Sequence, residues 1–329
     1  MRSSSGTDPL KVVLIAGWGR SGSTLLEAIV AQDDTFVALG EVRSLWQRGY
    51  LSNTLCGCGV PFTECPFWQK VDDAAFGGLD RDEARRIRGL NKEALRAASI
   101  PRLLLRRRSK RIVEYQDLLR HVFRTALDTS GASVVLDSSK DGVYGLMLAR
   151  MPGVELHIVH LVRDSRAVAF SWRRKVVRPE IHWETRLQPL LPVARSGIVW
   201  FYFNLVAATL RFFSRSYHFV RYEDFVADPA SAVAQVRINL GMDPAGWPVL
   251  DDHHIELPVV HQVAGNPGRF KGRSVELHLD DEWRRAMPRV DRWKVTAASW
   301  PLLLWYGYVG RGATPRDAVH TSASRVARG

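Results

Sequence analysis

A short apolar run followed at once by a glycine-rich turn is the feature that most restricts how this 329-residue chain can fold. Residues 11–16 (KVVLIA) are mostly aliphatic, as in a parallel strand that is buried on both faces. The turn from Gly17 to Gly22 comes next, and after it apolar residues recur at helical spacing over 23–31. The segment therefore predicts a buried strand, a loop and a helix.

Three later apolar runs, over 133–137, 156–162 and 218–222, also end in polar residues. Between them lie stretches with helical patterns, namely 114–127, 142–151, 165–176, 196–213 and 231–240. This alternation predicts an α/β fold with a mainly parallel central sheet flanked by helices. Because such sheets bind ligands at the carboxyl ends of their strands, the polar clusters there mark the expected site.

The chain is basic, with 46 Lys and Arg against 34 Asp and Glu and a formal net charge of +12, but the excess is uneven. Residues 102–111 hold six basic side chains and no acid, and the tail from Arg311 holds four arginines against one aspartate. A solvated helix face and attraction to an anionic partner both explain such a run. Since no helix-turn-helix, zinc-finger or RNA-recognition signature is present, no specific nucleic acid is expected.

The ends of the chain differ in composition from its body. We expect a disordered lead over 1–9, a single folded domain over 10–311 and a disordered basic tail over 312–329. The longest charge-free stretches, 196–210 and 295–310, are shorter than the roughly 20 residues of a spanning helix, so no transmembrane segment is expected. The start of the chain lacks the apolar core of a signal peptide, which favours the cytoplasm.

Three cysteines, Cys56, Cys58 and Cys65, lie within ten residues. Their odd number does not fit a secreted disulfide framework and favours a reducing compartment. They could give zinc three thiolates, but no Cys or His close in sequence supplies a fourth ligand, so no metal is expected and a tightly packed loop is the alternative. Further along, His253, His254 and His261 lie in a loop-like region without metal-site spacing and could contact an acceptor.

The glycine-rich turn nearly matches the phosphate-binding pattern G-x-x-x-x-G-K-[ST], with Ser23 where that pattern has lysine. Backbone N–H groups of the loop and of the following helix would still bind a phosphate, because free donors and the helix dipole both favour an anion. Arg20 could supply the missing cation. A tight strand-to-helix connection without a ligand is the alternative.

Residues 19–25, Gly-Arg-Ser-Gly-Ser-Thr-Leu, resemble the 5′-phosphosulfate loop of sulfotransferases that use 3′-phosphoadenosine-5′-phosphosulfate (PAPS), especially the carbohydrate and tyrosylprotein branches. A second resemblance is Arg163 at a strand end with Ser171 eight residues later, the pair that grips the 3′-phosphate in that family. A planar guanidinium and a hydroxyl suit a phosphate dianion. The donor-binding residues implied by the loop are Gly19, Arg20, Ser21, Gly22, Ser23 and Thr24.

The resemblance continues through most of the body of the chain. Glu41 falls where the tyrosylprotein branch has its catalytic base, and Lys140 where that branch has a lysine that stabilises the transition state. Tyr222 matches a nucleotide-contacting strand end, and Arg269 and Lys271 fall in a loop that closes over the nucleotide in related enzymes.

Departures and alternatives accompany this match. An arginine that assists the phosphate in the tyrosylprotein branch is Lys175 here. Each matched residue also fits a plain structural role: Glu41 paired with Arg43, Arg163 paired with Asp164, Ser171 on a helix surface, Lys140 on the protein surface, and Tyr222 in the core.

The resemblance implies a bacterial-type soluble sulfotransferase with a P-loop-NTPase-like fold. It would move the sulfuryl group of PAPS to a hydroxyl, or less favourably an amine, of a small-molecule, sugar or lipid acceptor. Glu41, Lys140 and Arg20 would be catalytic, adenosine 3′,5′-bisphosphate would be the product, and no metal would be required. Segments 45–115 and 178–197, with Trp46, Trp68 and Trp183, would form the acceptor pocket. The alternatives are a P-loop kinase or NTPase with Asp137 as magnesium ligand, and a non-catalytic protein that binds nucleotides or polyanions.

Overall fold

The computed structural model describes residues 9–105, 109–244, 254–270, 272 and 274–310. Its centre is a five-stranded sheet in the order β2-β3-β1-β4-β5, in which every neighbouring pair is parallel. The predicted α/β class and parallel sheet are confirmed. The strands are β1 (Leu10–Gly17), β2 (Phe36–Gly40), β3 (Val134–Lys140), β4 (Val154–Val162) and β5 (Ser216–Arg221).

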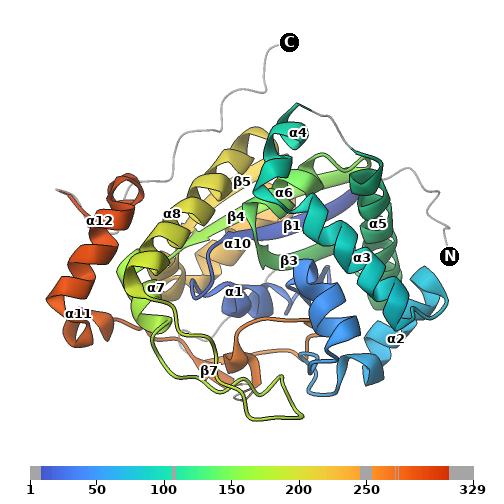
Figure 1. Ribbon diagram of the computed structural model, residues 1–329, viewed down its shortest axis with the longest axis horizontal. Helices are drawn as coiled ribbons and strands as arrows, with labels where there is room; N and C mark the ends of the chain where they lie inside the picture. The colour runs from blue at the N-terminus through green and yellow to red at the C-terminus, as the bar shows by residue number, and fades with distance from the viewer. Residues whose placement is uncertain (1–8, 106–108, 245–253, 271, 273, 311–329) are drawn as a thin grey trace.

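Helices cover both faces of this sheet, as the unbroken apolar run of β1 requires (Figure 1). Val12, Leu14 and Ala16 point into a core shared with α2, α3, α5 and α6, while Val13 and Ile15 point into a second core with α1, α9 and α10. The helices are α1 (Ser23–Val30), α2 (Pro66–Phe76), α3 (Arg81–Ala94), α4 (Ile100–Leu104), α5 (Lys110–Ser130), α6 (Gly142–Ala149), α7 (Ser165–Ser171), α8 (Val193–Thr209), α9 (Tyr222–Ala227), α10 (Pro229–Asn239), α11 (Trp283–Ala286) and α12 (Arg289–Trp305).

All five predicted helices differ from the observed bounds at one end or both, among them those over 165–176 and 114–127. The helix expected over 165–176 ends at Ser171, and the ring of the next residue, Trp172, lies under the Arg20 guanidinium of the glycine-rich loop. The helix expected over 114–127 is longer, from Lys110 to Ser130. Its side-chain cap at Ser109 and the left-handed Gly131 after its last turn set these ends.

The segment Val193–Phe212, which contains α8, is long and apolar enough to cross a membrane by length and composition alone. Such a helix is weak evidence for a membrane span, and α8 has the contacts of a packing helix. Trp200 donates from Nε1 to the carbonyl of Arg163 at 2.9 Å, and buried Asn204 bonds to His160 at 3.0 Å. With α12, it covers the end of the sheet at the left of Figure 1.

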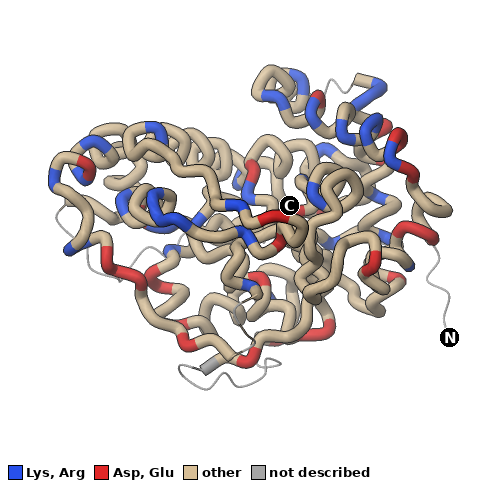
Figure 2. Tube along the Cα trace, turned by 60° about the horizontal axis from the view of Figure 1, so that its bottom comes forward, with Lys and Arg blue, Asp and Glu red and all other residues tan. Residues whose placement is uncertain are grey.

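The expected lead over 1–9 and tail over 312–329 lie, except for Pro9, outside the described residues, as do 106–108 in the basic run. The rest of that run is not one helix, because Arg102 belongs to α4 whereas Lys110 and Arg111 begin α5. Figure 2 shows basic and acidic residues interleaved along the trace. Arg111, for example, lies 2.6 Å from Glu93 on α3. In the described part of this run, acids from another helix therefore partly offset the positive charge.

Candidate active site

A cavity of about 750 Å³ opens beside the carboxyl ends of β1, β2 and β3. Its volume is in the range of sites that hold a cofactor or drug-sized ligand. Segments far apart in sequence form its walls: the glycine-rich loop, the loop around Gly57, and the late segment 257–270. Eight of the residues predicted from sequence line it, namely Gly19, Arg20, Gly22, Ser23, Thr24, Glu41, Lys140 and Arg269.

The glycine-rich loop turns sharply between β1 and α1. Gly22, directly before α1, has φ of 89°, and Arg20 has φ of 71° although it is not a glycine. A Cβ on Gly22 would lie 2.6 Å from the ring of Tyr222, so glycine here serves both the turn and the close packing. Among the described residues, no acceptor bonds the backbone N–H groups of residues 19–24. Free N–H donors at the start of a helix are what the predicted anion cradle requires.

Glu41 and Lys140 form an ion pair at the cavity wall, with Lys140 Nζ 2.7 Å from Glu41 Oε1. Lys140 has φ of 65° and also donates to the carbonyl of Ser138 at 2.7 Å. The side chains are only 26% and 13% exposed, so solvent screens this pair weakly. The expected partner of Glu41, Arg43, instead lies 3.0 Å from Asp141. Glu41, which follows β2, and Lys140, which ends β3, therefore meet at one point although they are 99 positions apart in the sequence.

Behind this pair lies Glu27, a fully buried carboxyl that the sequence analysis missed. It accepts hydrogen bonds from Gly40 N at 2.7 Å, from Ser138 Oγ at 2.6 Å and from Gln262 Nε2 at 2.9 Å. Burial raises the pKa of Glu27 to about 8, although its hydrogen-bond donors lower the value in part. Glu27 thus links α1, the ends of β2 and β3, and the late segment. Its place on an apolar helix pattern gave no signal of this role.

Arg269 comes from the late segment and lines the cavity, half-buried, with its Nε and Nη1 atoms shielded from solvent. Its Nη2 donates to the carbonyl of Leu55 at 3.2 Å, whereas Nε and Nη1 have no partner among the described residues. Burial lowers the pKa of Arg269, partly offset by Glu180 and Glu41. The same segment meets the loop where Asn266 N donates to Thr24 Oγ1 at 3.0 Å. A buried guanidinium with free donors is a ready ligand for an anion. Lys271 lies outside the described residues.

Three further charged residues line the cavity without having been predicted. Glu180 lies 2.8 Å from Arg178 and 3.9 Å from Arg48. Glu180 Oε2 and Arg178 Nη2 have no partner in the described ranges. These residues come from segments 45–115 and 178–197, which were expected to form the acceptor pocket. The prediction that Trp46 and Trp68 line that pocket is wrong, because both lie in the core, at 0% and 1% exposure.

Arg163, Ser171, Tyr222 and Ser21 do not line the cavity, although three of them lie against the loop or belong to it. Arg163 donates to the carbonyl of Arg20 at 3.3 Å and stacks on the ring of Tyr222 at 4.5 Å. Its ionic partner is Asp280 at 3.2 Å rather than Asp164. The structure records no contact between Arg163 and Ser171, which ends α7. Buried Ser21 Oγ has no partner in the described part of the chain.

Asp137, the magnesium ligand of the kinase alternative, is buried away from the cavity. It accepts from Ser139 N at 2.8 Å and from Tyr144 Oη at 2.8 Å. Burial raises the pKa of Asp137 to about 6. This carboxyl serves the packing of β3 against α6, so the geometry does not support the kinase alternative.

A model of the sulfotransferase family matches residues 13–245, well over half of the chain. The chain belongs to the sulfotransferase family. The matched region holds the loop, Glu41, Lys140 and Arg163, whereas the late segment with Arg269 lies beyond it. No curated protein matches this sulfotransferase significantly.

Several solved structures are similar to this sulfotransferase. The sulfotransferase domain of the olefin synthase of Synechococcus PCC 7002 is 17% identical, with 92% of this chain and 98% of that one covered at a TM-score of 0.48. The sulfotransferase domain from the curacin biosynthetic pathway is 18% identical over 89% and 98%, also at 0.48. A sulfotransferase from Alicyclobacillus acidocaldarius is 13% identical over 89% and 96%, at 0.37.

Proposed function

We propose that this sulfotransferase moves the sulfuryl group of PAPS to a hydroxyl of a small-molecule, sugar or lipid acceptor, in the cytoplasm. An amine acceptor is the less favoured form of the same reaction. The observation that carries the proposal is the Glu41–Lys140 ion pair in the wall of a cavity whose other wall is a loop of unbonded N–H groups. A general base and a cation thus lie beside an anion cradle.

The residues around the cavity fit a donor with several anionic groups. The N–H groups of residues 19–24 suit the 5′-phosphosulfate, and Arg269 has two buried donors still free among the described residues. We propose Arg163 and Ser171 as ligands of the 3′-phosphate, and Tyr222 as a contact of the nucleotide. Arg163 already contacts the loop, and a phosphate there would share or replace Asp280 as its anionic partner.

PAPS supplies an activated sulfuryl group, so the protein needs only to position the reactants and stabilise charge. Glu41 Oε1 is held by Lys140, which leaves the other carboxylate oxygen to take the proton of the acceptor hydroxyl. The acceptor oxygen bonds to sulfur as the bond from sulfur to the 5′-phosphate oxygen breaks. Lys140 and Arg20 stabilise the charge that grows on the sulfuryl and leaving-group oxygens, and adenosine 3′,5′-bisphosphate leaves.

Calorimetric titration tests the donor assignment directly. We expect micromolar binding of adenosine 3′,5′-bisphosphate and at least tenfold weaker binding of ATP with magnesium. Preference for ATP would overturn the proposal in favour of a kinase, and binding of neither nucleotide would favour the polyanion-binding alternative.

The base assignment is tested with Glu41→Gln, which keeps the shape of the side chain. Turnover with ³⁵S-labelled PAPS and a panel of hydroxyl acceptors should fall by about 10²–10⁴-fold, with bisphosphate affinity nearly unchanged. Glu184→Gln, on an exposed residue that does not line the cavity, is the matched control. Unchanged turnover in Glu41→Gln would remove Glu41 as the base.

A further inference from the structure

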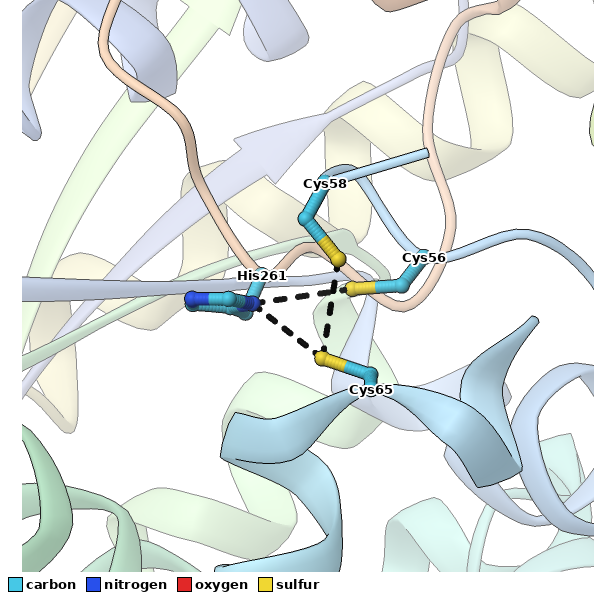
Figure 3. A group of neighbouring side chains, drawn as sticks. All are labelled: Cys56, Cys58, Cys65 and His261. Atoms are coloured by element: carbon cyan, nitrogen blue, oxygen red, sulfur yellow. Dashed lines mark hydrogen bonds between the residues drawn. The ribbon is translucent and has the colours of Figure 1, made fainter. Parts of the chain in front are cut away.

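Three cysteines and one histidine converge next to the cavity, in a cluster that the proposed reaction does not use. The thiols of Cys56, Cys58 and Cys65 and one ring nitrogen of His261 all lie within 4.8 Å of one another. Figure 3 shows the four side chains pointing toward a common centre. The sequence analysis expected no metal because it found no fourth ligand nearby. The fold supplies one, 196 residues after Cys65.

The spacings of these atoms fit a tetrahedral metal site. Around zinc, with Zn–S of about 2.3 Å and Zn–N of about 2.0 Å, the ligand atoms lie about 3.5–3.8 Å apart. Cys58 Sγ and Cys65 Sγ are 3.6 Å apart, and His261 Nδ1 is 3.2 Å from Cys65 Sγ and 4.0 Å from Cys56 Sγ. The four atoms therefore surround a space of the size that one zinc ion requires.

Close backbone contacts hold the loop that carries the three cysteines against the segment that carries His261. A Cβ on Gly57 would lie 2.4 Å from the carbonyl of Val260, so only glycine allows this approach. Gly57 N donates to the carbonyl of Gln262 at 2.9 Å. Trp68 Nε1 donates to the carbonyl of His261 at 2.7 Å, and the ring of Phe67 stacks on the imidazole. Neighbouring groups thus fix the orientation of His261, as the surroundings of metal-bound histidines do.

We propose that Cys56, Cys58, Cys65 and His261 bind one zinc ion in a closed structural site. Three thiolates and an imidazole are a soft donor set that favours zinc over magnesium or calcium. Four protein ligands leave no open position for water or substrate, so the ion has no part in the chemical step. Its role is to tie the loop 56–65 to the segment 257–266, which forms a wall of the cavity. This inference does not depend on the identity of donor or acceptor.

Metal analysis of the full-length protein, purified without chelator, tests the site. We expect about one zinc per chain by inductively coupled plasma mass spectrometry, and a tetrahedral thiolate–cobalt spectrum after exchange with Co²⁺. Cys56→Ser and His261→Ala should lower the zinc content at least tenfold and remove that spectrum. His278→Ala, which changes an exposed histidine outside the cluster, should keep both.

Loss of a ligand can also unfold the chain, so a second variant replaces one ligand by another. His261→Cys supplies a fourth thiolate and should keep one zinc per chain, with a cobalt spectrum shifted toward that of a four-sulfur site. Folded wild-type protein that holds three free thiols and no zinc in the presence of excess zinc would overturn the proposal. So would a disulfide between Cys58 and Cys65 in place of metal, detected as a loss of two hydrogens in the intact mass.

Discussion

Two glutamates near Gly40 lie in opposite surroundings. Glu41, the next residue in the chain, reaches the cavity and pairs with Lys140, whereas Glu27 is buried and accepts the Gly40 N–H. Glu27 also holds Ser138, whose carbonyl accepts from Lys140. The buried carboxyl therefore fixes the backbone on both sides of the Glu41–Lys140 ion pair. We infer that it is a positioning residue rather than a catalytic one.

This arrangement predicts a pH-dependent contribution of Glu27 to stability. Because its pKa is raised from about 4.5 to about 8, its contribution is fully present below pH 4.5 and is lost as pH rises through 8. In Glu27→Gln the new amide can donate to Gln262 Oε1, which lacks a partner in the described part of the chain. Between pH 5 and pH 8, urea unfolding should show wild type losing on the order of 1–3 kcal/mol relative to this variant.

Other titrating groups, such as Asp137 with its pKa raised to about 6, are present in both proteins and cancel in the difference. A difference in unfolding free energy that stays constant from pH 5 to pH 8 would contradict the raised pKa of Glu27.

Replacing Arg269 by alanine should weaken the binding of adenosine 3′,5′-bisphosphate without lowering the stability of the fold. Its buried Nε and Nη1 lack partners among the described residues, so removing the side chain also removes a desolvation cost. Arg269→Ala should weaken binding of adenosine 3′,5′-bisphosphate at least tenfold in calorimetry and leave the melting temperature equal or higher. Arg285→Ala, on a side chain that is 82% exposed, should change neither. If Arg269→Ala and wild type bound the bisphosphate with equal affinity, Arg269 would not be a ligand of the donor.

Among the structural elements of the site, the glycine-rich loop is tightly packed at Gly22. In Gly22→Ala, the alanine must keep the left-handed backbone conformation of Gly22, and its methyl group must displace the Tyr222 ring. Gly153→Ala is a matched control, since Gly153 has φ of 72° but open space around it. Both substitutions should cost about 1 kcal/mol in urea unfolding through strain, and only Gly22→Ala should also weaken bisphosphate binding, by tenfold or more. If Gly22→Ala and Gly153→Ala changed bisphosphate binding equally, backbone strain alone would explain the effect of Gly22→Ala.

The sequence predicted the core of the fold because local patterns decide it. The apolar runs that became β1, β3 and β4 are buried on both faces, and their composition alone indicates this. The run that became β5, at the edge of the sheet, is mostly half-buried. β2, only five residues long, was not predicted as a strand. The helix α12 was missed because it contains Pro301 and has only a weak apolar face.

The site was predictable where motifs follow strands, and not where loops from distant segments meet. Lys140 ends β3 and Gly22 lies in the loop after β1, so their approach at one edge follows from the predicted sheet. Glu41 follows β2, which was not predicted, and its assignment came from the resemblance to the family alone. Glu180 and His261 belong to loops whose positions depend on packing across more than a hundred residues. His261 could have been assigned only by asking which distant histidine completes three clustered thiols.

At the scale of the whole molecule, the positive charge of the cavity predicts transfer without magnesium. Arg20, Lys140 and Arg269 can neutralise the donor, so transfer from PAPS should proceed within twofold of its normal rate when magnesium is omitted and EGTA is present. Zinc content must be measured in the same samples, because loss of the proposed structural ion would lower activity for a separate reason. A full loss of transfer with zinc retained, restored by magnesium, would argue against this reading.

The late segment also bears on how the protein is made. Thr24 bonds to Asn266, and Gln262 bonds to Glu27, so the first loop of the chain is completed by residues synthesised about 240 positions later. N-terminal parts of a nascent chain generally fold first. On the ribosome the sheet can therefore form with its anion cradle open to solvent. The cavity wall formed by the late segment can then be completed only after residue 266 has left the ribosome, late in the synthesis of the domain.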